Sequence, residues 1–167
     1  MSRTSVLSRG RFAVVLVALA LVASACSSKD NLNAAAGAGG APSTPGSQQD
    51  FVVNVGDRVF FETDSPELTV QARATLDKQA QWLNRYGNYG VVQLEGHADE
   101  RGTREYNLAL GARRAQTVRD YLASRGVNPQ RLRTISYGKE RPVAVCDDIS
   151  CWSQNRRVVT ALGGPSS

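Results

Sequence analysis

Side chains able to recognise a charged ligand gather in two neighbouring stretches of the chain. A predicted strand ends in a polar loop that carries His97 and Asp99. Asn107, Leu110 and Arg114 then follow at spacings of three and four, which puts them on one face of a helix. This pattern places a carboxylate near a guanidinium, and two interpretations stay open. The pair forms a salt bridge, or it forms a split clamp that binds the ammonium and the carboxylate of one ligand.

The same stretch also contains residue types that occur in catalytic sites. Glu95 and Asp99 would have to serve as the paired carboxylates of a glycan-cleaving enzyme, but a strand running into a loop does not fix their separation. His97 is the only histidine of the chain, and no nucleophile accompanies it. We therefore expect His97 to be a structural hydrogen-bonding residue that shapes the loop, and we expect neither an enzyme nor a cofactor.

Alternating strand and helix patterns position these residues. The order is β-α-β-α-β-β, which predicts an α/β domain, a two-layer sandwich with helices packed on one face of a small mixed sheet. The predicted strands cover residues 51–55 with 58–61, 91–96, 132–138 and 157–162, and the predicted helices cover 66–86 and 104–125. A polar loop over 98–103 joins the second strand to the second helix.

The first residues have the composition of an export signal. Residues 1–11 carry three arginines and no acid, and residues 12–23 form one apolar run. This run is shorter than the ~20 residues that a membrane-spanning helix needs. Small residues then precede Cys26, as at a site of cleavage and lipid attachment in bacterial lipoproteins. We expect residues 1–25 to be removed and Cys26 to carry lipid, although an ordinary signal with a chance cysteine is the alternative.

Composition divides the remainder of the chain. Residues 26–50 consist mainly of small and polar residues, which predicts a flexible linker, and the folded domain is expected over 51–162. Residues 163–167 are expected to be a disordered tail. The formal charge of +5 includes the three arginines of the signal, so residues 26–167 carry only +2. This balance gives no support for nucleic-acid binding, which needs a clustered basic face.

Two cysteines remain once Cys26 is assigned to lipid. Cys146 and Cys151 are an even pair in an exported chain, which favours a disulfide. A metal site is the alternative, but His97 is distant in sequence and no further cysteine is present.

The loop and helix together closely resemble the OmpA-like peptidoglycan-binding domain. The resemblance rests on Gly96-His97-Ala98-Asp99-Glu100-Arg101-Gly102-Thr103 and on Tyr106 to Ala115, and it continues through residues 136–142 and 155–158. It covers about residues 57–162. It implies that Asp99 binds the ammonium of diaminopimelate in the stem peptide of peptidoglycan, and that Arg114 binds its carboxylate. It also implies that Asn107, Leu110, Thr63 and Asp64 line the same pocket.

The lipidation signal and the linker place the chain with the lipoproteins of this family. That resemblance implies anchoring in the outer membrane, a domain facing the periplasm, and TolB with the other Tol–Pal components as partners in envelope integrity and cell division. Two departures are visible: Glu62 stands where the family often has Asp, and the cysteine pair is not general. The same domain occurs in flagellar stator subunits, which instead need an uncleaved transmembrane helix.

Overall fold

The computed structural model describes residues 43–163, so the predicted signal, Cys26, most of the predicted linker and residues 164–167 lie outside it. Four strands form one mixed sheet in the order β1-β4-β2-β3. Strand β4 runs antiparallel to both β1 and β2, whereas β2 and β3 are parallel. The strands are β1 (Arg58–Phe60), β2 (Val92–His97), β3 (Leu132–Gly138) and β4 (Arg157–Leu162). The sheet and its order confirm the predicted fold class.

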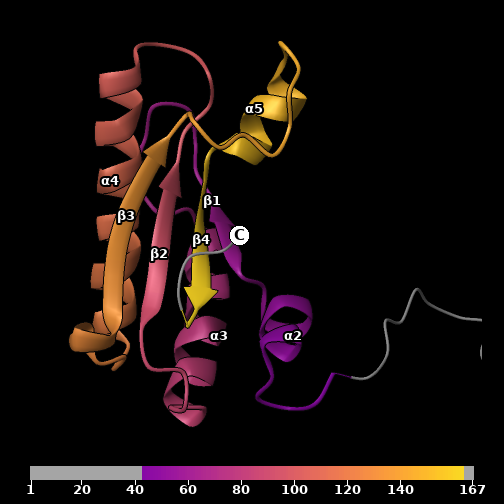
Figure 1. The fold of residues 1–167 in the computed structure, drawn as a ribbon, viewed down its shortest axis with the longest axis vertical. Coiled ribbons are helices and arrows are strands. Elements are labelled where there is room, and N and C mark those ends of the chain that lie inside the picture. Colours follow the sequence, from indigo (N-terminus) through magenta and orange to yellow (C-terminus); the bar gives the residue numbers. More distant parts are fainter. Residues whose placement is uncertain (1–42, 164–167) are drawn as a thin grey trace, which may run out of the picture. The chain divides into compact units, whose positions relative to one another are not determined.

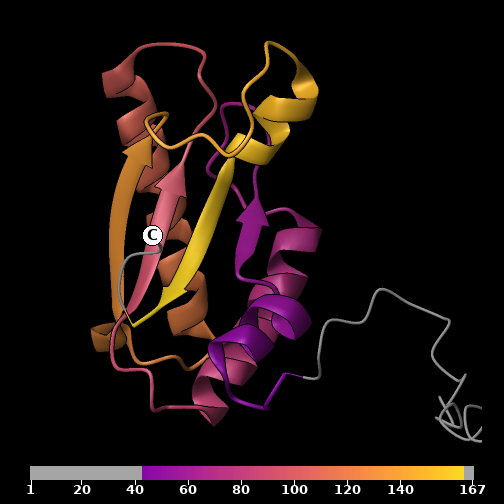
Figure 2. The same ribbon diagram turned by 45° about the vertical axis from the view of Figure 1, so that its right-hand side comes forward.

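Two long helices, α3 (Val70–Arg85) and α4 (Arg104–Ser124), cover one face of the sheet (Figures 1 and 2). Each begins at a threonine, because the hydroxyls of Thr69 and Thr103 accept the backbone N–H three residues on. The core lies between these helices and the sheet. Its fully buried side chains include Leu76, Leu83, Val92, Leu94, Val118, Leu122 and Val158.

Helix α4 lies very close to β2 at a pair of glycines. A Cβ atom on Gly96 would lie 1.9 Å from the backbone oxygen of Gly111, and one on Gly111 would lie 2.4 Å from the Ser136 hydroxyl. Any larger side chain would push the helix away from the sheet. This contact matters for function, because the start of α4 and the end of β2 carry the residues singled out above.

The first predicted strand is wrong. Residues 51–55 form a π-helical turn, Phe51–Val55, that continues the short helix α2 (Gln48–Asp50). The Ser47 hydroxyl caps this segment by accepting from the Asp50 N–H. Phe51 is fully buried and Val55 is partly buried, whereas the valines between them are exposed. Burial at positions four apart is helical periodicity, and it outweighs the β-propensity of a valine-rich run.

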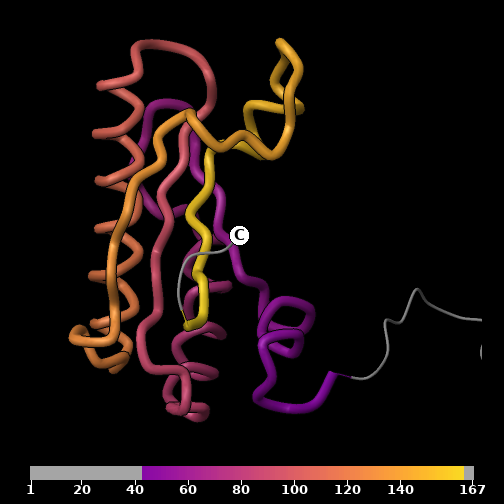
Figure 3. Tube along the Cα trace, in the orientation of Figure 1, coloured from indigo at the N-terminus to yellow at the C-terminus, as the bar shows by residue number. Residues whose placement is uncertain are grey.

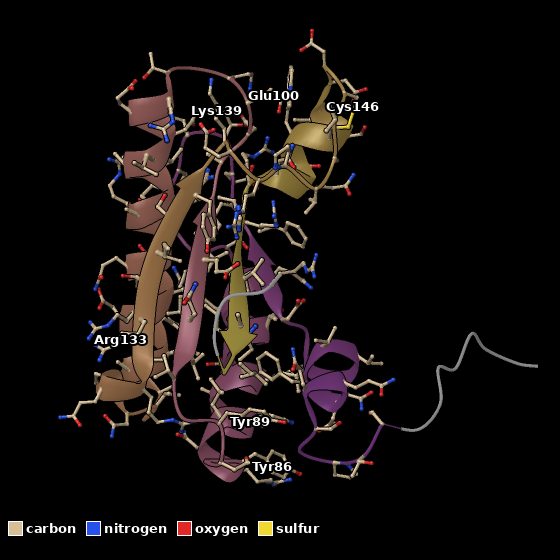
Figure 4. The ribbon with its side chains drawn as sticks, viewed as in Figure 1. Tyr86, Tyr89, Glu100, Arg133, Lys139 and Cys146 are labelled. Atoms are coloured by element: carbon tan, nitrogen blue, oxygen red, sulfur yellow. A yellow bond between two sulfur atoms is a disulfide. The ribbon has the colours of Figure 1, made fainter. Side chains whose placement is uncertain are left out.

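The folded unit also begins earlier than the sequence predicted. Residues 43–50 were assigned to the linker, yet Asp50 accepts a hydrogen bond from Trp82 Nε1 at 2.8 Å and Tyr89 donates to the Gly46 oxygen at 2.9 Å. Figure 4 labels Tyr86 and Tyr89 at this end of the molecule. The hydrogen bond from Trp82, with others from Asn54 and Gly46, holds the pKa of the Asp50 carboxyl below its ordinary value.

The segment between β3 and β4 contains a helix that the sequence did not predict. The chain leaves β3, forms α5 (Ile149–Asn155) beside the loop that follows β2, and returns as β4 (Figure 3). Cys146 and Cys151 form the predicted disulfide, with their Cα atoms 5.7 Å apart. Within residues 43–163, no helix is both long and apolar enough to cross a bilayer.

Candidate functional site

The six residues predicted to bind ligand lie around one hollow of about 210 Å³. It forms where β1 and β2 end and α4 begins, at one end of the sheet (Figure 2). The predicted residues are Thr63, Asp64, Asp99, Asn107, Leu110 and Arg114, and Arg101, Gly102 and Tyr106 complete the lining. The fold therefore brings together residues that are up to 51 positions apart in sequence, from Thr63 to Arg114. Their role in binding stays a prediction.

Asp99 is a nearly buried carboxylate on one wall of this hollow. Its side chain is 9% exposed, and Arg101 donates to it from Nε at 3.1 Å and from Nη2 at 2.8 Å. Arg156 lies behind it, with Nη1 3.4 Å from Oδ2. Burial alone would raise the pKa of Asp99, but the hydrogen bonds and charge of Arg101, with a hydrogen bond from Arg156, outweigh burial and lower it. Asp99 is therefore an anion at neutral pH.

Arg114 forms the floor of the hollow and is completely buried. Its guanidinium donates to the backbone oxygens of Ser65, His97 and Glu62, each at 2.9 Å. Burial lowers the pKa of Arg114 to about 10, and the charge of Arg156 adds to this effect. The side chain remains a cation at neutral pH. It also ties the segment after β1 to the last residue of β2, so it supports the hollow and adds a positive charge to it.

The salt bridge between Asp99 and Arg114 that the spacing allowed is not among the ion pairs of residues 43–163. Asp99 pairs with Arg101 and Arg156, and Arg114 is held by carbonyl groups. The two charges therefore stand on separate supports around one cavity. A ligand that contacts both groups would therefore not have to break a bond between them.

The outer wall consists of Thr63, Asp64 and Tyr106, all of them exposed. The Tyr106 hydroxyl donates to Asp64 Oδ1, and this bond spans the gap between the segment after β1 and the first turn of α4. Asp64 has a φ of 55°, a left-handed conformation that is uncommon for residues other than glycine and is concentrated at functional sites. Asp64 thus brings a second carboxylate to the rim.

Arg101 and Tyr106 are lining residues that the sequence analysis did not assign. Arg101 belongs to the matched motif, and its position two residues after Asp99 in a loop was the available signal, since that spacing lets the guanidinium fold back onto the carboxylate. Asn107 is nearly buried and donates to the Arg101 oxygen at 2.6 Å. The Asn107 amide therefore holds the loop in place, and fewer of its hydrogen-bonding groups remain for a ligand.

Residues from the segment between β3 and β4 brace the loop. Lys139 donates through Nζ to the oxygens of Glu100 and Gly102, at 3.1 and 2.7 Å, and Figure 4 shows Lys139 beside Glu100. Trp152 of α5 donates to Glu100 Oε1 at 2.5 Å, and the Arg101 guanidinium lies 4.2 Å from its ring. Trp152 thus holds the arginine that holds Asp99.

His97 does not play the predicted role. Its side chain is 2% exposed and stacks on Tyr137 at 5.5 Å, but neither ring nitrogen has a hydrogen-bond partner among the described residues. Burial lowers the pKa of His97 to about 3, with the charges of Arg157 and Arg141 adding to this, so the ring is neutral at neutral pH. Only the backbone oxygen of His97 helps to hold this region, by accepting a hydrogen bond from Arg114.

The chemistry available at this hollow is recognition of charge. Anionic Asp99 and Asp64 and cationic Arg101 and Arg114 surround a space large enough for one amino-acid side chain. Carboxylates are suited to accept hydrogen bonds from an ammonium, and the planar fork of a guanidinium matches a carboxylate. Within residues 43–163, no group of three or more histidine, cysteine, aspartate or glutamate side chains is arranged to hold a metal ion.

Comparison with known sequences gives one consistent result. The sequence profile described as the OmpA family matches residues 60–156. A Rhizobium meliloti protein named peptidoglycan-associated lipoprotein is 64% identical over 99% of this chain and 95% of its own length. Its namesake in Pseudomonas aeruginosa is 44% identical, with 89% of this chain and 94% of that protein covered.

Solved structures agree with the fold. The peptidoglycan-associated lipoprotein of Burkholderia pseudomallei is 40% identical and has a TM-score of 0.61, covering 64% of this chain and 89% of that one. The C-terminal domain of Helicobacter pylori MotB has a TM-score of 0.60, covering 66% of this chain and 86% of that one. Its identity of 24% shows a shared fold alone.

Proposed function

The chain belongs to the OmpA family, among its peptidoglycan-associated lipoproteins, and from this premise we propose that its domain binds the diaminopimelate-containing stem peptide of peptidoglycan. The binding is non-catalytic, and it tethers the outer membrane to the cell wall. The observation that carries the proposal is the hollow itself, in which Asp99 and Arg114 present opposite charges on separate supports.

The ligand chemistry suits this arrangement. The side chain of diaminopimelate ends in one carbon that carries both an ammonium and a carboxylate, a zwitterion of fixed geometry. Asp99 accepts from the ammonium, and the remaining N–H groups of Arg114 meet the carboxylate at the floor. Arg101 is exposed enough, at 41% of its side chain, to turn from Asp99 toward the ligand. Each charge-assisted hydrogen bond contributes about 1.5–3 kcal/mol, so one stem is held moderately and many copies together hold firmly.

Co-sedimentation with purified sacculi tests this function. We expect residues 43–167 to pellet with the sacculi, and we expect Asp99→Asn and Asp99→Ala to remain in solution, since an unpaired ligand ammonium costs about 2–5 kcal/mol. Asp120→Asn is the matched control, because Asp120 is an exposed acid on the same helix α4, away from the hollow. Melting curves must first show that each variant is folded. Equal pelleting of the Asp99 variants and the control would remove Asp99 from the site.

The attachment to the membrane is a second part of the proposal. Cys26 becomes the N-terminus after removal of residues 1–25 and carries lipid in the outer membrane, with the domain in the periplasm. Support comes from the sequence before Cys26 and from the lipoprotein names of relatives that match nearly the whole chain. Fractionation of cells that express Cys26→Ser tests it: the variant is expected in the soluble periplasmic fraction, and retention in the outer membrane would refute lipidation at Cys26.

The remaining part concerns partners. We propose TolB and the other Tol–Pal components as protein partners, in envelope integrity and cell division. Tyr106, which lines the hollow, and Leu108, two residues further along α4, are both exposed and offer apolar surface for such a contact. Competition between soluble stem peptide and purified TolB would show whether both use this end of the domain, and a lack of any TolB binding would end this part of the proposal.

A further inference from the structure

A second hollow, of about 440 Å³, lies on the face of the sheet opposite α3 and α4. Val92, Leu94 and Val158 point into the core, so the alternating residues Glu95, His97, Arg157 and Val159 face the other way. The segment that follows β3 completes the lining of this hollow with Arg141, Pro142 and Val143. None of these residues lines the first hollow, although Asp99 of the first hollow lies only two residues after His97.

Two buried side chains in this hollow have polar atoms without partners among the described residues. They are both ring nitrogens of His97, which is 2% exposed, and Nε of Arg157, which is 4% exposed. The other nitrogens of Arg157 reach backbone oxygens only at 3.2 and 3.4 Å. Buried polar atoms in native proteins nearly always have a hydrogen-bond partner, so these atoms indicate a missing one.

The charges around the hollow favour an anion. Arg157, Arg141 and Arg58 line it, against the acids Asp57 and Glu95. Burial lowers the pKa of Arg157 to about 10, and the charge of Arg58 adds to this, whereas Glu95 and Asp57 oppose it. Arg58 is paired with Asp57, and Arg141 stacks on Tyr137 with its guanidinium 3.7 Å from the ring centre. The three guanidinium groups outnumber the two carboxylates.

We propose that this second hollow binds the free α-carboxylate of a peptide. The carboxylate accepts from Nε of Arg157 and from Arg141. A neutral imidazole offers one donor and one acceptor, so His97 matches a carboxylate oxygen and the amide N–H beside it in a peptide terminus. Phosphate at neutral pH lacks that donor at a fixed position. Pro142, Val143 and Val159 supply an apolar wall for a small side chain such as methyl.

The experiment follows the single histidine of the chain. The full chain is purified in detergent without a histidine tag and is labelled with carbon-13 at the histidine Cε1, so one imidazole signal reports on His97. The probes are acetyl-D-alanyl-D-alanine, acetyl-L-alanyl-L-alanine and their C-terminal amides. Acetylation removes the ammonium that Asp99 would need, so binding at the first hollow is not measured. The D and L forms distinguish a cell-wall peptide from a protein terminus.

We expect a saturable shift of the His97 signal with at least one free acid at millimolar concentration, and none with the amides. Arg141→Gln, at an exposed position, should weaken the binding about tenfold while the chain stays folded. Asp99→Asn should leave it unchanged, even if it abolishes binding to sacculi. No shift with either acid, or equal shifts with acids and amides, would overturn the proposal and leave the stem-peptide site unaffected.

Discussion

At the scale of the residue, the motif predicted which side chains gather around the hollow, but it did not predict how they pair. Asp99 and Arg114 line one hollow as expected, yet the arginine that meets Asp99 is Arg101. Spacing along a helix shows which residues share a face, but it cannot show how a six-residue loop folds back on itself. The burial of His97 without a side-chain partner was likewise hidden, because it depends on strands that come together only in the sheet.

Arg114 should be intolerant of lysine. Lysine has a single nitrogen in place of the fork, so it cannot reach the oxygens of Ser65, His97 and Glu62 together, and each buried oxygen left unsatisfied costs about 1–3 kcal/mol. Urea unfolding of Arg114→Lys should show this loss together with weaker binding to sacculi. Its exposed neighbour gives the control, since Arg113→Lys should change stability by no more than about 0.5 kcal/mol. Equal stability of the two variants would contradict the role of Arg114 as a support.

His97 should make folding stability depend on pH. Its folded pKa of about 3 lies below the ordinary 6.5, so between these values the unfolded chain binds a proton that the folded chain does not. The contribution is fully present above pH 6.5 and declines as the pH falls toward 3, at about 1.4 kcal/mol per pH unit. Urea unfolding at about pH 7.5 and pH 5 should therefore differ by about 2 kcal/mol. The variant His97→Phe, which keeps an aromatic ring against Tyr137, should remove most of this difference in the free energy of unfolding. An unchanged difference would mean that other titrating groups cause the pH dependence.

At the scale of the element, the last two strands and the helix α4 were predicted well, and the valine-rich run of residues 51–55 was not. The bounds expected for β3 and β4 are those observed, and α4 differs by one residue. The run of residues 51–55 is too short for its periodicity to be separated from β-propensity, and its helical form depends on the packing of Phe51 against Trp82. Helix α5 was missed because it begins inside a disulfide loop and buries only Cys151 and Asn155.

The π-helical turn makes a prediction about where the domain begins. Phe51 is fully buried, with its ring centre 4.9 Å from that of Trp82, so Phe51→Ala should lower the free energy of unfolding by about 3–5 kcal/mol. Val53 lies in the same turn but is 64% exposed, so Val53→Ala should cost little. Urea unfolding of the two variants compares them directly. Similar small losses would mean that this segment is not part of the core in solution.

At the scale of the whole molecule, the sheet gathers the ends of β1 and β2 and the start of α4 at one place, and both hollows border the end of β2. Trp152 of helix α5 and Lys139 both donate hydrogen bonds to Glu100 and so hold the loop that follows β2. The family resemblance anticipated the first hollow because its residues belong to motifs. The second hollow was not anticipated, because no motif assigned its lining residues to one site. Several of them lie at alternate positions of separate strands, and only the folded sheet brings their charges together.

The most direct test of this account is calorimetric titration of residues 43–167 with two synthetic tripeptides. One is L-alanyl-D-glutamyl-diaminopimelate, and the other has lysine in the last position, which keeps the side-chain ammonium but lacks its carboxylate. Loss of a charge-assisted contact to the carboxylate predicts binding weaker by about ten- to a hundredfold for the lysine peptide. Asp99→Asn should weaken binding of the diaminopimelate peptide. Equal affinity for the two peptides would contradict the claim that opposite charges in this hollow recognise a zwitterion.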